Sequence, residues 1–129
     1  MPRIDTSALA HPKPAKREKR QRAGNDAGHL KNVRLLPCLA CGRGPVQAHH
    51  LLKNGEQKTR GIRRNADQWA VPLCMNCHDP NYPGSLHHSG DEVKWFSGRG
   101  IDQIAVAEAL WRRRGDYAAM KLVIERARP

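Results

Sequence analysis

Four cysteines fall into two C-x2-C pairs, Cys38 with Cys41 and Cys74 with Cys77. Two such tight turns present four thiolates, the ligand set that tetrahedral Zn²⁺ prefers. A closed four-sulfur shell leaves no position for water, so we predict a structural zinc and not a catalytic one. A redox pair or free thiols are the alternatives, and both fit this double spacing less well.

Five of the seven histidines follow the first cysteine pair. His49 and His50 are adjacent on a predicted strand, where their side chains point to opposite faces and cannot easily share one ion. We therefore expect one imidazole to bind a metal and the other to take a proton from water. His78 directly follows the last cysteine, and the prolines and glycine after it predict a loop that returns His87 toward the site. A polar pair beside a helix cap explains His87 and His88 equally well.

The long stretch between the cysteine pairs predicts an inserted hairpin. Its strands are expected over Val46–Leu52 and Trp69–Cys74. The connecting loop is polar and basic, and its cations are of the kind that bind a phosphate backbone. The predicted nucleic-acid-binding residues are Lys53, Lys58, Arg60, Arg63 and Arg64.

Helices are predicted after the hairpin. Ser89 and Glu92 fit a capping box that opens a short helix, and Asp102 is placed to cap the next one. That second helix carries a predicted core-facing stripe of Ile101, Ile104, Ala105 and Trp111. A final helix is expected where Tyr117, Met120, Ile124 and Ala127 recur at helical spacing.

Length and charge bound the organisation of the chain. Its 129 residues form one domain, and an aromatic content of 5% implies a modest core that zinc must supplement. Twenty-three Lys and Arg against 12 Asp and Glu give a formal charge of +11. We predict a flexible basic arm over 1–30, a zinc-stapled core over 31–100 and a helical extension over 101–129. The arm is expected to contact nucleic acid, the alternative being a solvated tail.

The sequence also sets expectations about location. No run of 18 apolar residues exists, and the N-terminus lacks an apolar segment before a small-residue cleavage site. We therefore expect a cytoplasmic protein with no membrane partner, in which lasting disulfides are rare.

The order of these motifs resembles the HNH endonucleases, over about residues 36–100. The residues that carry the resemblance are Cys38-x2-Cys41-Gly42, Ala48-His49-His50-Leu51, Asp67 and Val71-Pro72-Leu73-Cys74-x2-Cys77-His78. The continuation through Leu86-His87, Glu92 and Leu110-Trp111 is similar to small HNH proteins of phages and prophages. The resemblance implies an α+β fold with a small ββα-metal (HNH) core braced by a four-cysteine zinc site, C-terminal helices and a disordered basic N-terminal arm.

The resemblance also implies roles for the histidines. His50 would be the general base, and His49, the residue before it, a metal ligand. His78, His87 or both would complete the site of a catalytic divalent ion. Mg²⁺, Mn²⁺, Ni²⁺ and Zn²⁺ are all candidates for that ion.

The middle residue of the HNH motif steadies the base in the family. Only Asn65 or Asp67 is available for it here, and Asp67 is our candidate. The implied activity is metal-dependent hydrolysis of DNA phosphodiester bonds, in phage- or prophage-related DNA processing or recombination. Double-stranded DNA is the expected partner, and cutting both strands would call for a homodimer or two encounters.

A rival interpretation uses the same observations. A non-catalytic, zinc-stabilised DNA-binding or recombination accessory module fits the zinc and the basic charge equally well. Histidines at three converging positions favour the enzyme, because a binding module does not need them. RNA is a weaker third option, since no row of aromatic residues forms a stacking platform.

Overall fold

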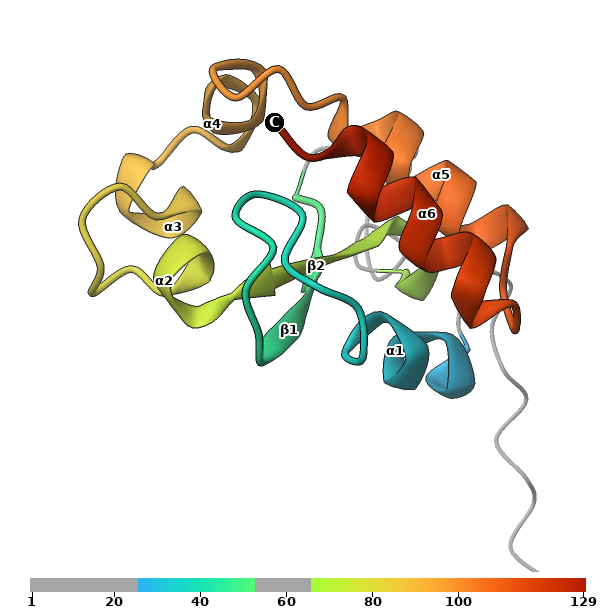
Figure 1. Cartoon of the computed structure of the whole chain (residues 1–129). Helices are drawn as coiled ribbons and strands as arrows, with labels where there is room; N and C mark the ends of the chain where they lie inside the picture. The colour runs from blue at the N-terminus through green and yellow to red at the C-terminus, as the bar shows by residue number, and fades with distance from the viewer. Residues whose placement is uncertain (1–25, 53–65) are drawn as a thin grey trace, which may run out of the picture.

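The computed structural model describes residues 26–52 and 66–129 and has a small α+β fold. In the described part, a two-stranded sheet is accompanied by helices that cluster at its two ends (Figure 1). In chain order the elements are α1 (Ala27–Val33), β1 (Val46–His50), η3 (Asp67–Trp69), β2 (Ala70–Cys74), α2 (Met75–His78), α3 (Leu86–Ser89), α4 (Glu92–Ser97), α5 (Gln103–Arg112) and α6 (Tyr117–Ala127).

The predicted hairpin is confirmed, with slightly shorter strands. β1 and β2 run antiparallel in a register that pairs Val46 with Cys74 and His50 with Ala70. Every residue of β2 is buried, whereas burial varies along β1. Pro72 is tolerated in β2 because, among the described strands, β2 pairs with β1 alone. The carbonyl of Pro72 accepts from the Leu39 amide at 2.9 Å, so the first cysteine turn lies against β2.

A short helix that the sequence did not predict lies at the start of the described part of the chain. α1 begins at Ala27, and the Asp26 carboxylate caps it by accepting from the His29 amide at 3.0 Å. The helix is short and glycine-containing, so its propensity is weak and its own sequence signal is small. Burial of Val33 against the rest of the fold stabilises it.

The predicted capping box is wrong. Ser85 caps α3 by accepting from the His88 amide, and Asp91 caps α4 by accepting from the Lys94 amide. Glu92 therefore does not fold back onto a cap; its side chain is buried. The cap predicted at Asp102 is confirmed, since its carboxylate accepts from the Ala105 amide at 3.0 Å.

The core joins the hairpin to the C-terminal helices, and α5 and α6 lie side by side along it (Figure 1). The buried face of α5 is turned relative to the predicted stripe: Val106, Ala107 and Leu110 are buried, and Ala105 is exposed. On α6, burial of Met120 and Ile124 follows the prediction. The fully buried large apolar side chains include Leu39, Leu51, Leu73, Leu86, Phe96, Leu110, Met120 and Ile124. None of the helices in 26–52 and 66–129 is long and apolar enough to span a bilayer.

Candidate metal centres

The four cysteines come together in one cluster. Cys38 and Cys41 lie in the turn after α1, Cys74 ends β2 and Cys77 belongs to α2. Their sulfur atoms all lie within 4.8 Å of one another, and Sγ of Cys41 is 3.5 Å from Sγ of Cys74. Sulfurs bound to zinc at ~2.3 Å in a tetrahedron are ~3.8 Å apart, so the cluster fits the ion. It could therefore hold a metal such as zinc.

Backbone geometry shapes the first cysteine turn. The Gly42 amide donates to the Cys38 carbonyl at 2.9 Å, and Gly42 has φ +76°, in the left-handed region that favours glycine. The guanidinium of Arg128 occupies the space that a Cβ on Gly42 would need. A larger residue at position 42 would thus strain the turn and displace the Arg128 side chain.

The electrostatics of the sulfurs also suit a cation. Hydrogen bonding from the Cys77 thiol lowers the pKa of Cys38 to about 4, with backbone N–H groups at Cys74, Cys41 and Ala40 contributing in the same direction. The neighbouring Cys38 raises the pKa of the Cys77 thiol, and desolvation raises that of Cys41. A bound divalent ion would favour ionisation of the thiols.

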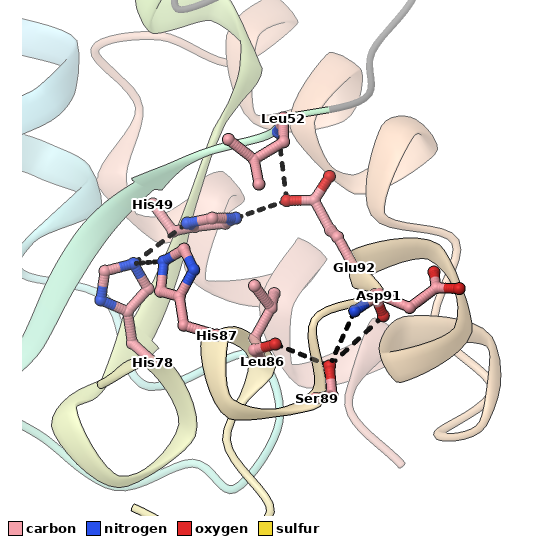
Figure 2. A network of polar contacts seen from close by, with 8 residues as sticks. All are labelled: His49, Leu52, His78, Leu86, His87, Ser89, Asp91 and Glu92. Carbon is pink, nitrogen blue, oxygen red and sulfur yellow. Dashed lines mark hydrogen bonds and ion pairs between the residues drawn. The ribbon is translucent and has the colours of Figure 1, made fainter. Parts of the chain in front are cut away.

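Three histidines form a second cluster, built from three different elements. His49 lies on β1, His78 ends α2 and His87 lies on α3, and their rings face one another (Figure 2). Nε2 of His78 is 3.0 Å from Nδ1 of His49 and 3.1 Å from Nε2 of His87. The intervening segment leaves the helical path after His78, as predicted, and both His78 and His87 reach His49.

The outer hydrogen bonds of this cluster orient two of its lone pairs inward. Nδ1–H of His78 donates to Oε1 of Gln47 at 2.8 Å, and Nε2–H of His49 donates to Oε1 of Glu92 at 2.6 Å. Nε2 of His78 and Nδ1 of His49 then both carry lone pairs, and two acceptors 3.0 Å apart cannot bond to each other. A shared cation resolves this conflict, and tetrahedral nitrogen ligands at ~2.0–2.1 Å are ~3.3 Å apart. The cluster fits a metal ion.

Burial lowers the pKa of two imidazoles of the cluster, His78 and His87, which favours the neutral form that metal ligation requires. Desolvation, reinforced by the neighbouring His49 and His87, lowers the pKa of His78 to about 4. Desolvation is also the main cause of the lowered pKa of His87. Near neutral pH, protons therefore compete only weakly with a metal ion for His78 and His87.

His50 lies apart from this cluster. It follows His49 on β1, but His49 is buried and the His50 side chain is 30% exposed. Nε2–H of His50 donates to Oδ1 of Asp67 at 3.0 Å, and Oδ2 of Asp67 accepts from the Asp26 amide at 2.9 Å. The expected separation of the two imidazoles is confirmed, and Asp67 is in contact with His50. Among the described residues, no hydrogen bond or ring contact joins His50 to His78 or His87.

Glu92 and Gln47 are partners of the histidines that the sequence did not predict. The spacing of Glu92 from Ser89 favoured a helix cap, and the useful signal was a carboxylate beside the apolar Val93, Trp95 and Phe96. Gln47 carried no comparable signal. The predicted nucleic-acid-binding residues of the basic loop, Lys53, Lys58, Arg60, Arg63 and Arg64, and also Asn65, lie outside the described residues.

Comparisons with known proteins place the chain in a family without assigning an activity. A search of curated proteins and a search of solved structures found no match. The model of one family, described as "Protein of unknown function (DUF968)", matches residues 8–110. This match spans both cysteine pairs and all three clustered histidines, and most of the chain. The chain belongs to the DUF968 family.

Proposed function

We propose that this protein is a metal-dependent endonuclease of the HNH type that hydrolyses DNA phosphodiester bonds. The observation that carries the proposal is the convergence of His49, His78 and His87 from three elements. A fourth histidine, His50, follows His49 directly in the chain and is hydrogen-bonded to a carboxylate. The cysteine cluster supports it, because α2 contains both Cys77 and His78. A zinc held by the four sulfurs would fix the start of α2 and therefore the position of His78.

The ligand set narrows the choice of the hydrolytic ion. Three neutral imidazoles suit Zn²⁺, Ni²⁺ or Mn²⁺ better than Mg²⁺, which prefers oxygen ligands. Such an ion, when bound, supplies Lewis-acid stabilisation of the phosphate and of the leaving oxygen. The role of His49, His78 and His87 is to hold it with their inward lone pairs.

His50 is the proposed general base. Because its Nε2–H donates to Asp67, the lone pair of Nδ1 is the one left to accept a proton from water. Asp67 would fix the tautomer and stabilise the imidazolium that forms, as the carboxylate does in a catalytic triad. The Asp26 amide in turn holds Asp67, which gives the base a fixed support.

DNA is the proposed substrate because of the charge of the chain. A formal charge of +11 favours a polyanion, and contacts to phosphates would make binding fall steeply with salt. The same charge fits a non-catalytic DNA-binding module, so the decisive measurement is cleavage.

The experiment is incubation of the full chain with supercoiled plasmid in EDTA or with Zn²⁺, Ni²⁺, Mn²⁺ or Mg²⁺. We expect metal-dependent nicking that His50→Ala lowers by ~10²–10⁴-fold, the usual contribution of a general base. His88→Ala is the matched control, because His88 is exposed and its ring contacts the Pro80 carbonyl at 3.3 Å, away from the cluster. Nicking that survives His50→Ala would remove His50 from this role. No nicking with any metal would favour the binding module.

A further inference from the structure

Glu92 is a buried carboxylate at the first position of α4. Its side chain and that of His49 are each only 3% exposed. A carboxylate in such a position is costly unless hydrogen bonds satisfy it. Its Oε1 accepts from Nε2–H of His49 at 2.6 Å and from the Leu52 amide at 3.1 Å (Figure 2). The Leu52 amide donates to the same oxygen that contacts His49, and a carboxylate oxygen that accepts both bonds leaves the shared proton on the imidazole.

This contact decides which nitrogen of His49 faces the other two histidines. With the proton on Nε2, the lone pair of His49 is on Nδ1, the atom 3.0 Å from His78. The opposite tautomer would place an N–H there and remove one ligand from the cluster. The negative charge of Glu92 also makes the imidazole a stronger ligand and offsets part of the charge of a bound cation.

Trp95 of α4 and Arg99, which follows the helix, contact the segment that leads to a second ligand. The carbonyl of Gly84 accepts from Nε1–H of Trp95 at 2.8 Å and from Nη2–H of Arg99 at 3.1 Å. The Arg99 guanidinium also stacks on the Trp95 ring, 3.8 Å from its centroid. Gly84 precedes Ser85, which caps the helix that carries His87. α4 is therefore bonded to the supports of two of the three histidines.

We propose that Glu92 is a positioning residue of the histidine metal centre: it fixes the metal-binding tautomer of His49, strengthens this ligand, and ties it to the end of β1 through the Leu52 amide. The inference rests on the metal-binding part of the proposed function and adds a residue to it. Glu92 acts through His49 and does not itself contact the metal.

The test measures metal affinity directly. The full chain is purified with zinc in the cysteine cluster, and Co²⁺ is titrated into the histidine site while its visible absorption is recorded. We expect Glu92→Gln, which keeps an acceptor oxygen but loses the charge, to weaken Co²⁺ binding by ~10–100-fold, the usual effect of removing such an outer partner. Glu92→Ala should weaken it further, because the buried Nε2–H of His49 and the Leu52 amide then lose their acceptor.

Two controls separate positioning from general destabilisation. Glu108→Gln removes an exposed carboxylate whose ion pair with Arg112 spans 3.9 Å, and it should leave Co²⁺ affinity unchanged. Proton NMR of Glu92→Gln should retain the Nε2–H signal of His49, since the amide oxygen still accepts from it. Co²⁺ binding as tight in folded Glu92→Gln as in the parent would overturn the inference, as would a parent that takes up no Co²⁺ beyond the cysteine cluster.

The outcome is independent of cleavage. If the parent does not nick DNA but Glu92→Gln weakens Co²⁺ binding, the nuclease proposal fails and the inference holds. If the parent nicks DNA and Glu92→Gln leaves Co²⁺ affinity unchanged, the inference alone fails.

Discussion

The cysteine cluster and the histidine cluster meet at α2, where Cys77 and His78 are adjacent, but they are built differently. The cysteine ligands come in two pairs, one from the turn after α1 and one from the junction of β2 and α2. The histidine ligands come from β1, α2 and α3, one from each element. Each cysteine pair is therefore local in sequence, although its partner pair lies more than 30 residues away, whereas no two histidine ligands come from the same element.

Their outer partners differ in the same way. The Cys38 sulfur is approached by backbone N–H groups of the turns themselves. His49 and His78 are instead oriented by the side chains of Glu92 and Gln47. A cluster supported by backbone can organise with its own turn, whereas one supported by distant side chains depends on the fold. We infer that the cysteine cluster stabilises the structure on which the histidine cluster depends.

The largest expected effect follows from breaking the cysteine cluster. Cys77→Ala should abolish cooperative unfolding, because structural zinc contributes ~10–16 kcal/mol in small zinc domains, and whole domains are stable by only ~5–15 kcal/mol. Circular dichroism and zinc content would measure this. Metal binding by the histidines should be lost together with the fold.

Met75→Leu is the control for this variant, because Met75 lies on the same short helix and is 49% exposed. It should keep both the zinc and the fold. A folded Cys77→Ala protein that still binds Co²⁺ at the histidines would show that the two clusters are independent.

The same contrast explains what the sequence could predict. The cysteine cluster could be predicted because two C-x2-C pairs are the spacing typical of a zinc site. The opposite orientations of His49 and His50 followed from the period of a strand. The approach of both His78 and His87 to His49 was only an open alternative, since it depends on the path of the loop after α2.

Glu92 shows why the remaining contacts were hidden. Its position three residues after Ser89 matched a capping box, a local pattern, but Asp91 caps the helix and burial beside His49 uses the carboxylate instead. α1 was missed for a related reason, because tertiary packing and not propensity stabilises it. Contacts between residues far apart in the chain, such as that of Leu52 with Glu92, leave no spacing to read.

A smaller effect is expected on the stability of the protein at acidic pH. The folded protein holds the pKa of His78 at about 4, below its ordinary value of 6.5. As pH falls from about 6.5 to 4, the unfolded chain binds a proton that the folded chain does not, so the free energy of unfolding decreases over this window and is unaffected above it. His87, whose pKa is also lowered, acts in the same direction.

Urea denaturation at several pH values would check this in protein with zinc on the cysteines and the histidine site stripped. His78→Gln should lose stability less steeply with acid than the parent, whatever its stability at neutral pH. Comparing slopes removes the acid sensitivity of the cysteine zinc, which both proteins share. Equal slopes would mean that His78 is not the group that resists protonation.

The smallest expected effect separates a helix that supports the histidines from one that supports only the core. Asp91 caps α4 and Asp102 caps α5, with carboxylate-to-amide distances of 3.1 and 3.0 Å. Replacing either by Ala should cost about 1 kcal/mol of stability, measured by urea denaturation. Only Asp91→Ala should also weaken Co²⁺ binding, because Glu92 is the next residue.

The expected loss of affinity for Asp91→Ala is at most about fivefold, since a cap contributes about 1 kcal/mol and local opening of α4 cannot cost more than that. Asp102→Ala is the matched control: it removes the same kind of bond from a helix that contributes no side chain to the histidine cluster. Equal Co²⁺ affinities in the two variants would show that α4 supports His49 through its burial alone and that the order of its first turn is unimportant. A lower Co²⁺ affinity in Asp91→Ala alone would show that the histidine centre depends on the order of the first turn of α4. This turn carries Glu92, the carboxylate that orients His49.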